Sequence, residues 1–199
     1  MTKNILLFAL TLCAATLFGQ QFKGGLTAGL VGSQVAGDNF SGYKKAGLFA
    51  GGFVTLSLSP TSSLQMELTY FQKGSRENPT EDNNYVSYLL RVNYIELPLL
   101  YQYHAGRFVI EAGPSGGFLA GYYEEDNYNV GNDIKTMSRV TLQINLGVAL
   151  QLSPNWSAFL RTNNSLFNIR KQNKDGDVHR FWDYGQYNDA LVLGIRYLI

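Results

Sequence analysis

The chain has 199 residues, a formal net charge of +1 and a mean hydropathy of -0.10. A nearly neutral chain lacks the basic footprint of a nucleic-acid-binding protein, so we expect no nucleic-acid partner. The polar average also excludes a bundle of apolar transmembrane helices, although membrane β-barrels share such averages because half of each strand faces inward.

Residues 1–20 form a segment of their own. Lys3 provides a charged start, and an apolar run of about 13 residues follows from Ile5 to Leu17. This layout predicts a cleaved signal peptide over residues 1–20, because a membrane-anchoring helix needs about 20 apolar residues. Cys13 is the single cysteine of the chain. Its place in this segment predicts a mature protein without disulfide or thiol chemistry.

Beyond residue 20 the apolar residues alternate with polar or small ones, which is typical of β-strands. The clearest example is the segment 138–152, where Val140, Leu142, Ile144 and the following even-numbered residues form one aliphatic row. Because successive strand side chains point to opposite faces, the other face is polar or small. The segment is longer than the roughly 9 to 11 residues with which a tilted strand crosses a bilayer. The predicted strands are 22–32, 46–58, 63–74, 89–103, 107–123, 138–152, 156–167 and 187–199.

The connections between these strands alternate in length. Short ones at 59–62, 104–106 and 153–155 are rich in Pro, Gly, Ser and Asn, which favour tight turns. Long polar ones occupy 33–45, 75–88, 124–137 and 168–186. This pattern predicts an all-β fold, an eight-stranded antiparallel up-and-down transmembrane β-barrel domain over residues 21–199, with short periplasmic turns and long extracellular loops.

Five blocks of the chain carry a family resemblance: residues 22–26 (FKGGL), 67–74 (ELTYFQKG), 93–100 (NYIELPLL), 113–117 (GPSGG) and 194–197 (GIRY). They resemble the PorT-like outer-membrane β-barrel proteins of Bacteroidetes, and the resemblance spans essentially the whole mature chain. It implies a barrel in the outer membrane of a Gram-negative bacterium. It implies no single activity, since members of that family are functionally diverse, and it brings no catalytic motif to this chain.

The last predicted strand ends in an apolar row from Leu191 to Ile199, with Gly194 and Arg196 on the opposite face. It looks like the terminal strand that outer-membrane assembly machinery reads. We therefore expect that machinery, outer-membrane lipid and lipopolysaccharide as partners of a monomer, while the partner of the extracellular loops stays unidentified. Aromatic residues near the strand ends predict interfacial belts: Tyr70, Tyr101, Tyr103, Tyr122, Tyr123, Trp156 and Tyr197.

If the aliphatic rows face lipid, the charged residues of the strands face the interior. An eight-stranded barrel has an interior just wide enough for side chains to fill it, so these charges predict a structural ion network that plugs the barrel. The expected network comprises Lys23, Glu67, Lys73, Glu96, Glu111, Arg161 and Arg196. The same rows carry Gln65, Gln102, Gln143, Asn145 and Gln151. In the alternative interpretation, Glu67, Glu96 and Glu111 line a cation path or perform acid–base chemistry.

Other candidate sites are weak. Ser165, His179 and Asp183 could form a nucleophile, base and orienting acid, but nothing in their spacing favours this over a solvated loop. The segment 173–177 (NKDGD) lacks a bidentate Glu at the twelfth position of a calcium loop, where Tyr184 stands. The acidic residues Glu124, Glu125, Asp126 and Asp133 could hold a divalent ion between lipopolysaccharide phosphates, but such a cluster is more typical of a hydrated loop. We expect no catalytic residue, metal or cofactor.

The sequence thus predicts a non-enzymatic outer-membrane barrel with a filled interior and long loops for interaction or envelope structure. Its main rival is a soluble secreted barrel of the lipocalin type, in which the apolar rows would face inward around an apolar ligand. A lipid-modifying outer-membrane enzyme or a small pore are lesser alternatives.

Overall fold

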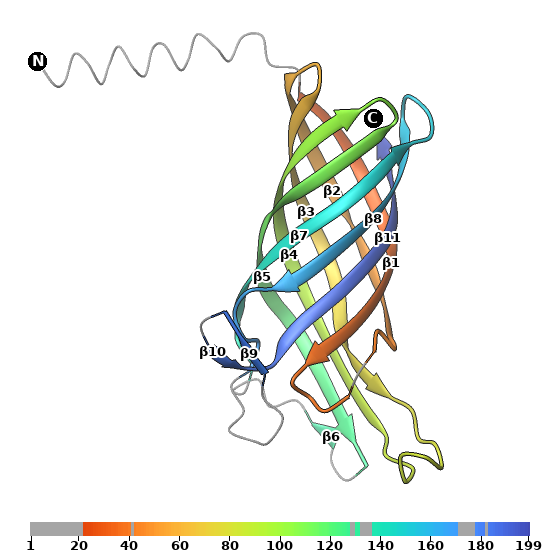
Figure 1. The fold of residues 1–199 in the computed structure, drawn as a ribbon, viewed down its shortest axis with the longest axis vertical. Helices are drawn as coiled ribbons and strands as arrows, with labels where there is room; N and C mark the ends of the chain where they lie inside the picture. The colour runs from red at the N-terminus through yellow and green to blue at the C-terminus, as the bar shows by residue number, and fades with distance from the viewer. Residues whose placement is uncertain (1–21, 41, 128–129, 132–136, 171–177, 182) are drawn as a thin grey trace, which may run out of the picture.

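The computed structural model describes residues 22–40, 42–127, 130–131, 137–170, 178–181 and 183–199 (Figure 1). The predicted signal peptide over residues 1–20, the segment 173–177 and Asp133 lie outside this described part. Eight long strands dominate it: β1 (Phe22–Ala36), β2 (Lys45–Ser59), β3 (Ser62–Glu77), β4 (Tyr88–Ala105), β5 (Phe108–Asp126), β7 (Val140–Gln151), β8 (Trp156–Ser165) and β11 (Tyr187–Leu198).

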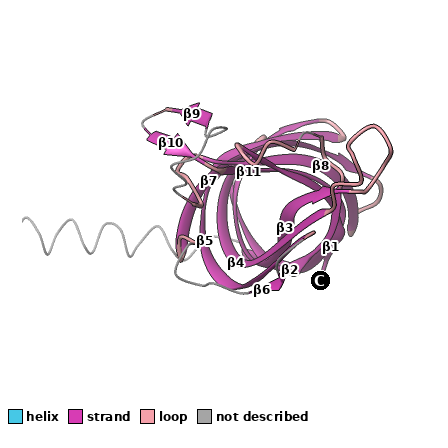
Figure 2. Ribbon diagram, turned by 90° about the horizontal axis from the view of Figure 1, so that it is seen from below, coloured by secondary structure: helices cyan, strands magenta, loops and turns pink. Residues whose placement is uncertain are grey.

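Each long strand pairs antiparallel with its neighbours in sequence, and β1 pairs with β11 to close the sheet. The predicted eight-stranded antiparallel up-and-down barrel is therefore confirmed, and Figure 2 shows the strands forming a ring. Three short strands lie in the long connections: β6 (Val130–Gly131), β9 (Val178–Arg180) and β10 (Asp183–Gly185). In the described residues, no helix is long and apolar enough to cross a membrane.

The alternation of apolar and polar residues determines which side chains point outward and which point into the barrel. On β7, the outward Leu146 is 57% exposed, whereas its inward neighbours Asn145 and Gln143 are each 1% exposed. The same exposed aliphatic row continues around the barrel on every long strand. Shifting a strand by one residue would move charges into lipid and aliphatic groups into the polar interior, so this register is strongly specified.

The short turns lie at the end of the barrel that holds both described ends of the chain (Figure 1). Gly106, in the turn between β4 and β5, has a φ of 64°, a left-handed conformation that glycine adopts without steric cost. At the opposite end, β3 and β4 run further than predicted, because β3 continues to Glu77 and β4 starts at Tyr88. The loop between these two strands is correspondingly shorter than the sequence suggests, whereas β8 ends at Ser165, two residues earlier than predicted.

Tyr122 corrects one expectation of the sequence. It was expected in an interfacial belt, yet its side chain is buried beside Leu90 and Val92 inside the barrel. The pairing of β4 with β5 shifts by one residue between Asn93 and Tyr94. This irregularity reverses the alternation of β5 beyond Leu119, so that Tyr122 turns inward and the row of odd-numbered residues turns outward.

Candidate functional site

Six of the seven residues of the predicted network have their charged side chains buried inside the barrel, and none of the six is more than 4% exposed. Three are carboxylates and three are cations, so their formal charges cancel. They come from the inward rows of five strands: Glu67 and Lys73 on β3, Glu96 on β4, Glu111 on β5, Arg161 on β8, and Arg196 on β11. They form two groups, one nearer the short turns and one nearer the long loops.

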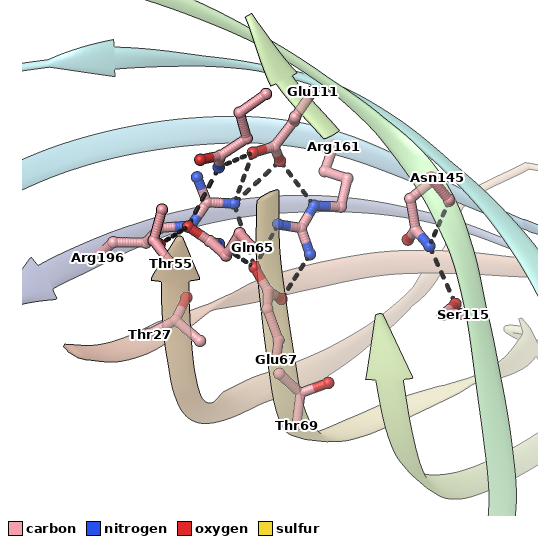
Figure 3. Close-up of polar contacts among 12 residues, drawn as sticks. Thr27, Thr55, Gln65, Glu67, Thr69, Glu111, Ser115, Asn145, Arg161 and Arg196 are labelled. Atoms are coloured by element: carbon pink, nitrogen blue, oxygen red, sulfur yellow. Dashed lines mark hydrogen bonds and ion pairs between the residues drawn. The ribbon is translucent and has the colours of Figure 1, made fainter. Parts of the chain in front are cut away.

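The first group, which we call the central ion cluster, contains Glu67, Glu111, Arg161 and Arg196 (Figure 3). Arg161 donates two hydrogen bonds to the Glu67 carboxylate, at 2.8 and 2.7 Å, and one from Nε to Glu111 at 2.8 Å. Arg196 Nη2 lies 2.9 Å from Glu111 and 3.4 Å from Glu67. Because β3 and β8 are four strands apart in the ring, the bonds between Glu67 and Arg161 cross the lumen.

Neutral side chains add further hydrogen bonds to this cluster. Gln65 donates to Glu67 at 2.6 Å, and Gln102 donates to Glu111 at 3.2 Å. The Phe159 ring lies 5.0 Å from the guanidinium carbon of Arg161 and 4.2 Å from that of Arg196, a cation–π arrangement. Buried ions are tolerated only when they are paired and hydrogen-bonded, and each of these carboxylates meets two guanidinium groups.

The second group, which we call the Lys73 cluster, contains Lys73, Glu96, Asn163, Asn145 and Ser115. Lys73 Nζ donates to Glu96 and to Asn163, which lies on the opposite strand β8. Asn163 in turn donates to Glu96 at 3.1 Å and to Asn145 at 2.8 Å, and Asn145 donates to Ser115 at 3.0 Å. This network again spans the lumen, so the two clusters block the interior at successive levels.

Lys23 differs from the expectation that it belongs to this network. It lies on the inward row of β1, but its side chain is exposed at the barrel mouth near the short turns. Alternation predicted its direction correctly, but Lys23 is only the second residue of β1 and lies too close to the strand end to reach the carboxylates. Gln151, at the end of β7, is likewise only half-buried at this mouth.

An apolar layer closes the interior on the side of the long loops. Met137 and Ile169, both from long connections, pack with Leu90, Val92 and Tyr94. Above them, Arg170 donates to Glu124 at 3.0 and 2.8 Å. Burial opposes the charge of Arg170, but the Glu124 carboxylate outweighs this effect and raises the pKa of Arg170 above its usual value. The pair ties the connection that follows β8 to the end of β5.

The hairpin of β9 and β10 folds against the outside of the barrel wall (Figure 2). Arg180 donates to both carboxylate oxygens of Asp189, at 2.7 and 2.8 Å, and Asn164 donates to Asp189 at 2.7 Å. Asp189 lies on the outward row of β11, yet it is only 4% exposed because the hairpin covers it. The bond to Asp189 raises the pKa of Arg180, and Tyr187 donates its hydroxyl hydrogen to the Asp183 carbonyl at 2.6 Å.

Two contacts were not predicted from the sequence. One joins Lys73 to Asn163 inside the barrel, and the other joins Arg180 to Asp189 outside it. Asn163 follows Arg161 by two residues, so alternation could have placed it on the inward row. Nothing in the local pattern could have paired Arg180 with Asp189, because Asp189 interrupts an otherwise aliphatic outward row and Arg180 lies on the short strand β9 within a long connection.

A family model for the outer membrane protein beta-barrel domain matches residues 17–171. The chain belongs to this family. It is therefore an outer-membrane β-barrel protein of the Gram-negative envelope, as the strand pattern predicted. The lipocalin-type alternative is not favoured, because the aliphatic rows of this outer-membrane barrel face outward and the charged rows are enclosed.

Two solved structures share the fold of this outer-membrane barrel. The Neisserial surface protein A is 12% identical, with a TM-score of 0.58, over 90% of this chain and 98% of its own. Ail, the attachment invasion locus protein of Yersinia pestis, is 11% identical, with a TM-score of 0.51, over 90% of this chain and 99% of its own. No curated protein matches the chain.

The remaining candidate sites gain little from the structure. Ser165 is buried and donates its hydroxyl hydrogen to the Asn188 carbonyl at 3.1 Å, whereas His179 is exposed and packs against the Tyr184 ring. These two residues lie in different environments, one inside the barrel and one on the hairpin outside it. Among the described residues, no group of three or more His, Cys, Asp or Glu side chains could hold a metal ion.

Proposed function

We propose that this outer-membrane barrel is a non-enzymatic envelope protein that presents an ordered extracellular surface on a closed interior. The observation that carries the proposal is the filled lumen, in which two charge-paired clusters and an apolar layer leave the inward carboxylates Glu67, Glu96 and Glu111 engaged with cations. A solute path or an acid–base site would need at least one of these carboxylates to be free. The five sequence blocks support the finer proposal that the protein is PorT-like.

The extracellular connections are held in place by their own hydrogen bonds. Between β3 and β4, Asn83 accepts a bond from the Thr80 amide at 2.9 Å and donates to the Asn78 carbonyl at 2.9 Å. Asn127, directly after β5, accepts a hydrogen bond from the Ser87 amide at 2.6 Å and donates one to the Tyr85 carbonyl at 3.1 Å. Such preorganisation lowers the entropic cost of binding a partner.

Large aromatic side chains project from this ordered surface. Tyr85, Phe181 and Tyr184 are 61%, 61% and 62% exposed. Exposed aromatic residues on a rigid support are the residues that most often dominate the binding energy of protein interfaces. We therefore assign recognition to the loop between β3 and β4 and to the hairpin of β9 and β10.

Lipopolysaccharide is the second proposed partner. Arg76 on β3 and Arg91 on β4 are exposed on the outer wall, near the loop ends of their strands. Arg76 pairs with Leu89 and Arg91 pairs with Gly74, so the two cations are diagonal neighbours, about 7 to 8 Å apart at their backbones. The guanidinium group of arginine can donate two parallel hydrogen bonds to one phosphate group. We expect the loop ends of β3 and β4 to lie at the level of the outer-leaflet headgroups. We further propose that β11 is the strand read by the assembly machinery, and that the barrel is a monomer because its sheet has no free edge.

Site-specific photo-crosslinking on intact cells tests the recognition surface. A photoreactive residue at Tyr85 or Phe181 is expected to give a discrete adduct with a partner. The matched control replaces Leu193, which is 62% exposed but lies on the lipid-facing row, and is expected to give none. No discrete adduct at either loop position, or the same adducts at Leu193, would contradict the proposal.

A further inference from the structure

A cavity opens at the periplasmic mouth of the barrel, among the short turns. It encloses about 230 Å³, and side chains from all eight long strands contribute to its wall. We call it the vestibule. Its floor is formed by Arg196, Gln65 and Gln102, which are the outermost residues of the central ion cluster and its hydrogen-bonding neighbours. The vestibule is thus continuous with the periplasm and separated from the rest of the lumen by the cluster.

The charged residues that line the vestibule are all cations. Lys23 and Arg196 line it, and no Asp or Glu is among its lining residues. The carboxylates of Glu67 and Glu111 lie behind Arg196 and are engaged with Arg161 as well. The other polar lining groups are hydroxyls, amides and an imidazole, all of which can donate hydrogen bonds.

Each of the two cations has a donor group that lacks a partner among the described residues, Nε of Arg196 and Nζ of Lys23. Arg196 is 4% exposed, and its Nε has no hydrogen-bond partner. A buried donor without an acceptor is unfavourable, and an anion in the vestibule would stabilise the positive charge of this guanidinium group. Lys23 forms no ion pair with any described residue, although it stands on the inward row opposite Thr55.

Neighbouring side chains give the vestibule a defined shape. Gly25 lies under the ring of Phe53, where a Cβ atom would come within 2.4 Å of that ring. Ser63 Oγ lies 2.7 Å from His104 Nε2 and donates to Gln102 at 3.0 Å. The rim hydroxyls and the floor amides are therefore fixed in place before any ligand binds.

We propose that the vestibule binds a small oxyanion-bearing periplasmic solute, a phosphate or carboxylate compound, between Lys23 and Arg196. The volume lies below the roughly 300 to 1,000 Å³ of drug-sized ligand sites, so it suits a small anion with a few waters. Two cations of the vestibule then meet one anion, and the hydroxyls around the wall supply further donors. This role is independent of what the extracellular loops recognise.

Isothermal titration tests the proposal with protein purified from outer membranes in a non-ionic detergent at low ionic strength. Inorganic phosphate and acetate are titrated separately, and stronger binding of one identifies the source of the anionic group. We expect saturable binding of at least one probe at a single site. Lys23→Gln should weaken it about tenfold, the loss expected for one charge-assisted hydrogen bond.

Two further variants make the result specific. Ser57→Glu places a carboxylate in the vestibule and should abolish binding without removing a donor cation. Lys44→Gln removes an exposed lysine that pairs with Glu77 at the opposite end of the barrel, and should leave the affinity unchanged. Heat-modifiable gel migration confirms that each variant is folded. Absence of saturable heat with both probes, unchanged affinity in Lys23→Gln, or an equal loss in Lys44→Gln would overturn the proposal.

Discussion

Glu67 and Arg161 meet from opposite walls of the barrel, and both terminal nitrogens of the guanidinium donate to the carboxylate, at 2.8 and 2.7 Å. The two residues are 94 positions apart in the sequence. Their bonds run across the lumen rather than along one strand. We call this pair a strut, because it blocks the lumen and links two strands on opposite sides of the barrel.

Replacing Glu67 by Gln should destabilise the barrel, because Arg161 loses a bidentate anionic partner in a buried setting. A broken buried ion pair typically costs about 3 to 5 kcal/mol, and we expect the lower part of this range because Glu111 remains bonded to Arg161. Urea unfolding in lipid vesicles measures the change. The control Glu81→Gln removes an exposed loop carboxylate and should have little effect; equal midpoints for both variants would rule out the strut.

The Lys73 cluster should behave as a coupled unit. Lys73→Met leaves Glu96 without its cation and should cost about 3 to 5 kcal/mol in the free energy of unfolding. Adding Glu96→Gln to it should recover part of this loss, since residues of one buried network are not additive. A double-mutant cycle measures the coupling energy. Strictly additive losses would mean that Lys73 and Glu96 do not stabilise each other.

The lipid and lumen faces of β7 can be tested with one residue from each. Leu146→Arg puts a charge near the middle of the lipid-facing row and should cost about 2 to 4 kcal/mol. The sequence alone suggests Gln143→Lys as the mild inward comparison, but Gln143 is 1% exposed and bonded to Ser115, so that change is not mild. Gln151→Lys, on the same inward row at the wet vestibule mouth, is the better control. Equal loss of folded protein in the two variants would contradict the assignment of faces.

Asp189→Asn should loosen the hairpin of β9 and β10 from the barrel wall, because Arg180 loses a charged bidentate acceptor. Hydrogen bonds to charged groups are worth about 1.5 to 3 kcal/mol, so local opening should become roughly ten times more frequent or more. Trypsin cleavage after Arg180 on intact cells, located by mass spectrometry, reports this opening. Asp82→Asn in the exposed loop between β3 and β4 is the control. The same cleavage rate in wild type and Asp189→Asn would show that the pair does not hold the hairpin.

The sequence predicts the barrel well because its two faces meet different solvents. The aliphatic row of Val140, Leu142 and Leu146 can only face lipid once the opposite row is polar, and this rule extends to every long strand. It fails where the pairing becomes irregular, as at Tyr122, which turns inward after the shift opposite Asn93. Alternation predicts whether a side chain points inward or outward, but not how far along the barrel it lies from the ion clusters. For this reason the sequence places Lys23 among the buried ions.

The pairing of the interior charges could not be derived from the sequence. Alternation placed Glu67, Glu111, Arg161 and Arg196 on inward rows, but which carboxylate meets which guanidinium depends on strand tilt and stagger, and these are set by the whole closed sheet. The contact of Arg180 with Asp189 could not be predicted from the sequence for a different reason. It joins a loop to the outside of the wall, where no periodic pattern operates.

Single-channel recording in planar lipid bilayers tests the central claim, that the interior is closed, most directly. Because the struts of Glu67 with Arg161 and of Lys73 with Asn163 cross the lumen below an apolar layer, the wild-type barrel should insert without conductance steps. Insertion is verified independently by the heat-modifiable migration of protein recovered from the same membranes. Silence across the voltage range is the predicted result, whereas steady steps of a single size would contradict the account and make Glu67, Glu96 and Glu111 the lining of a pore.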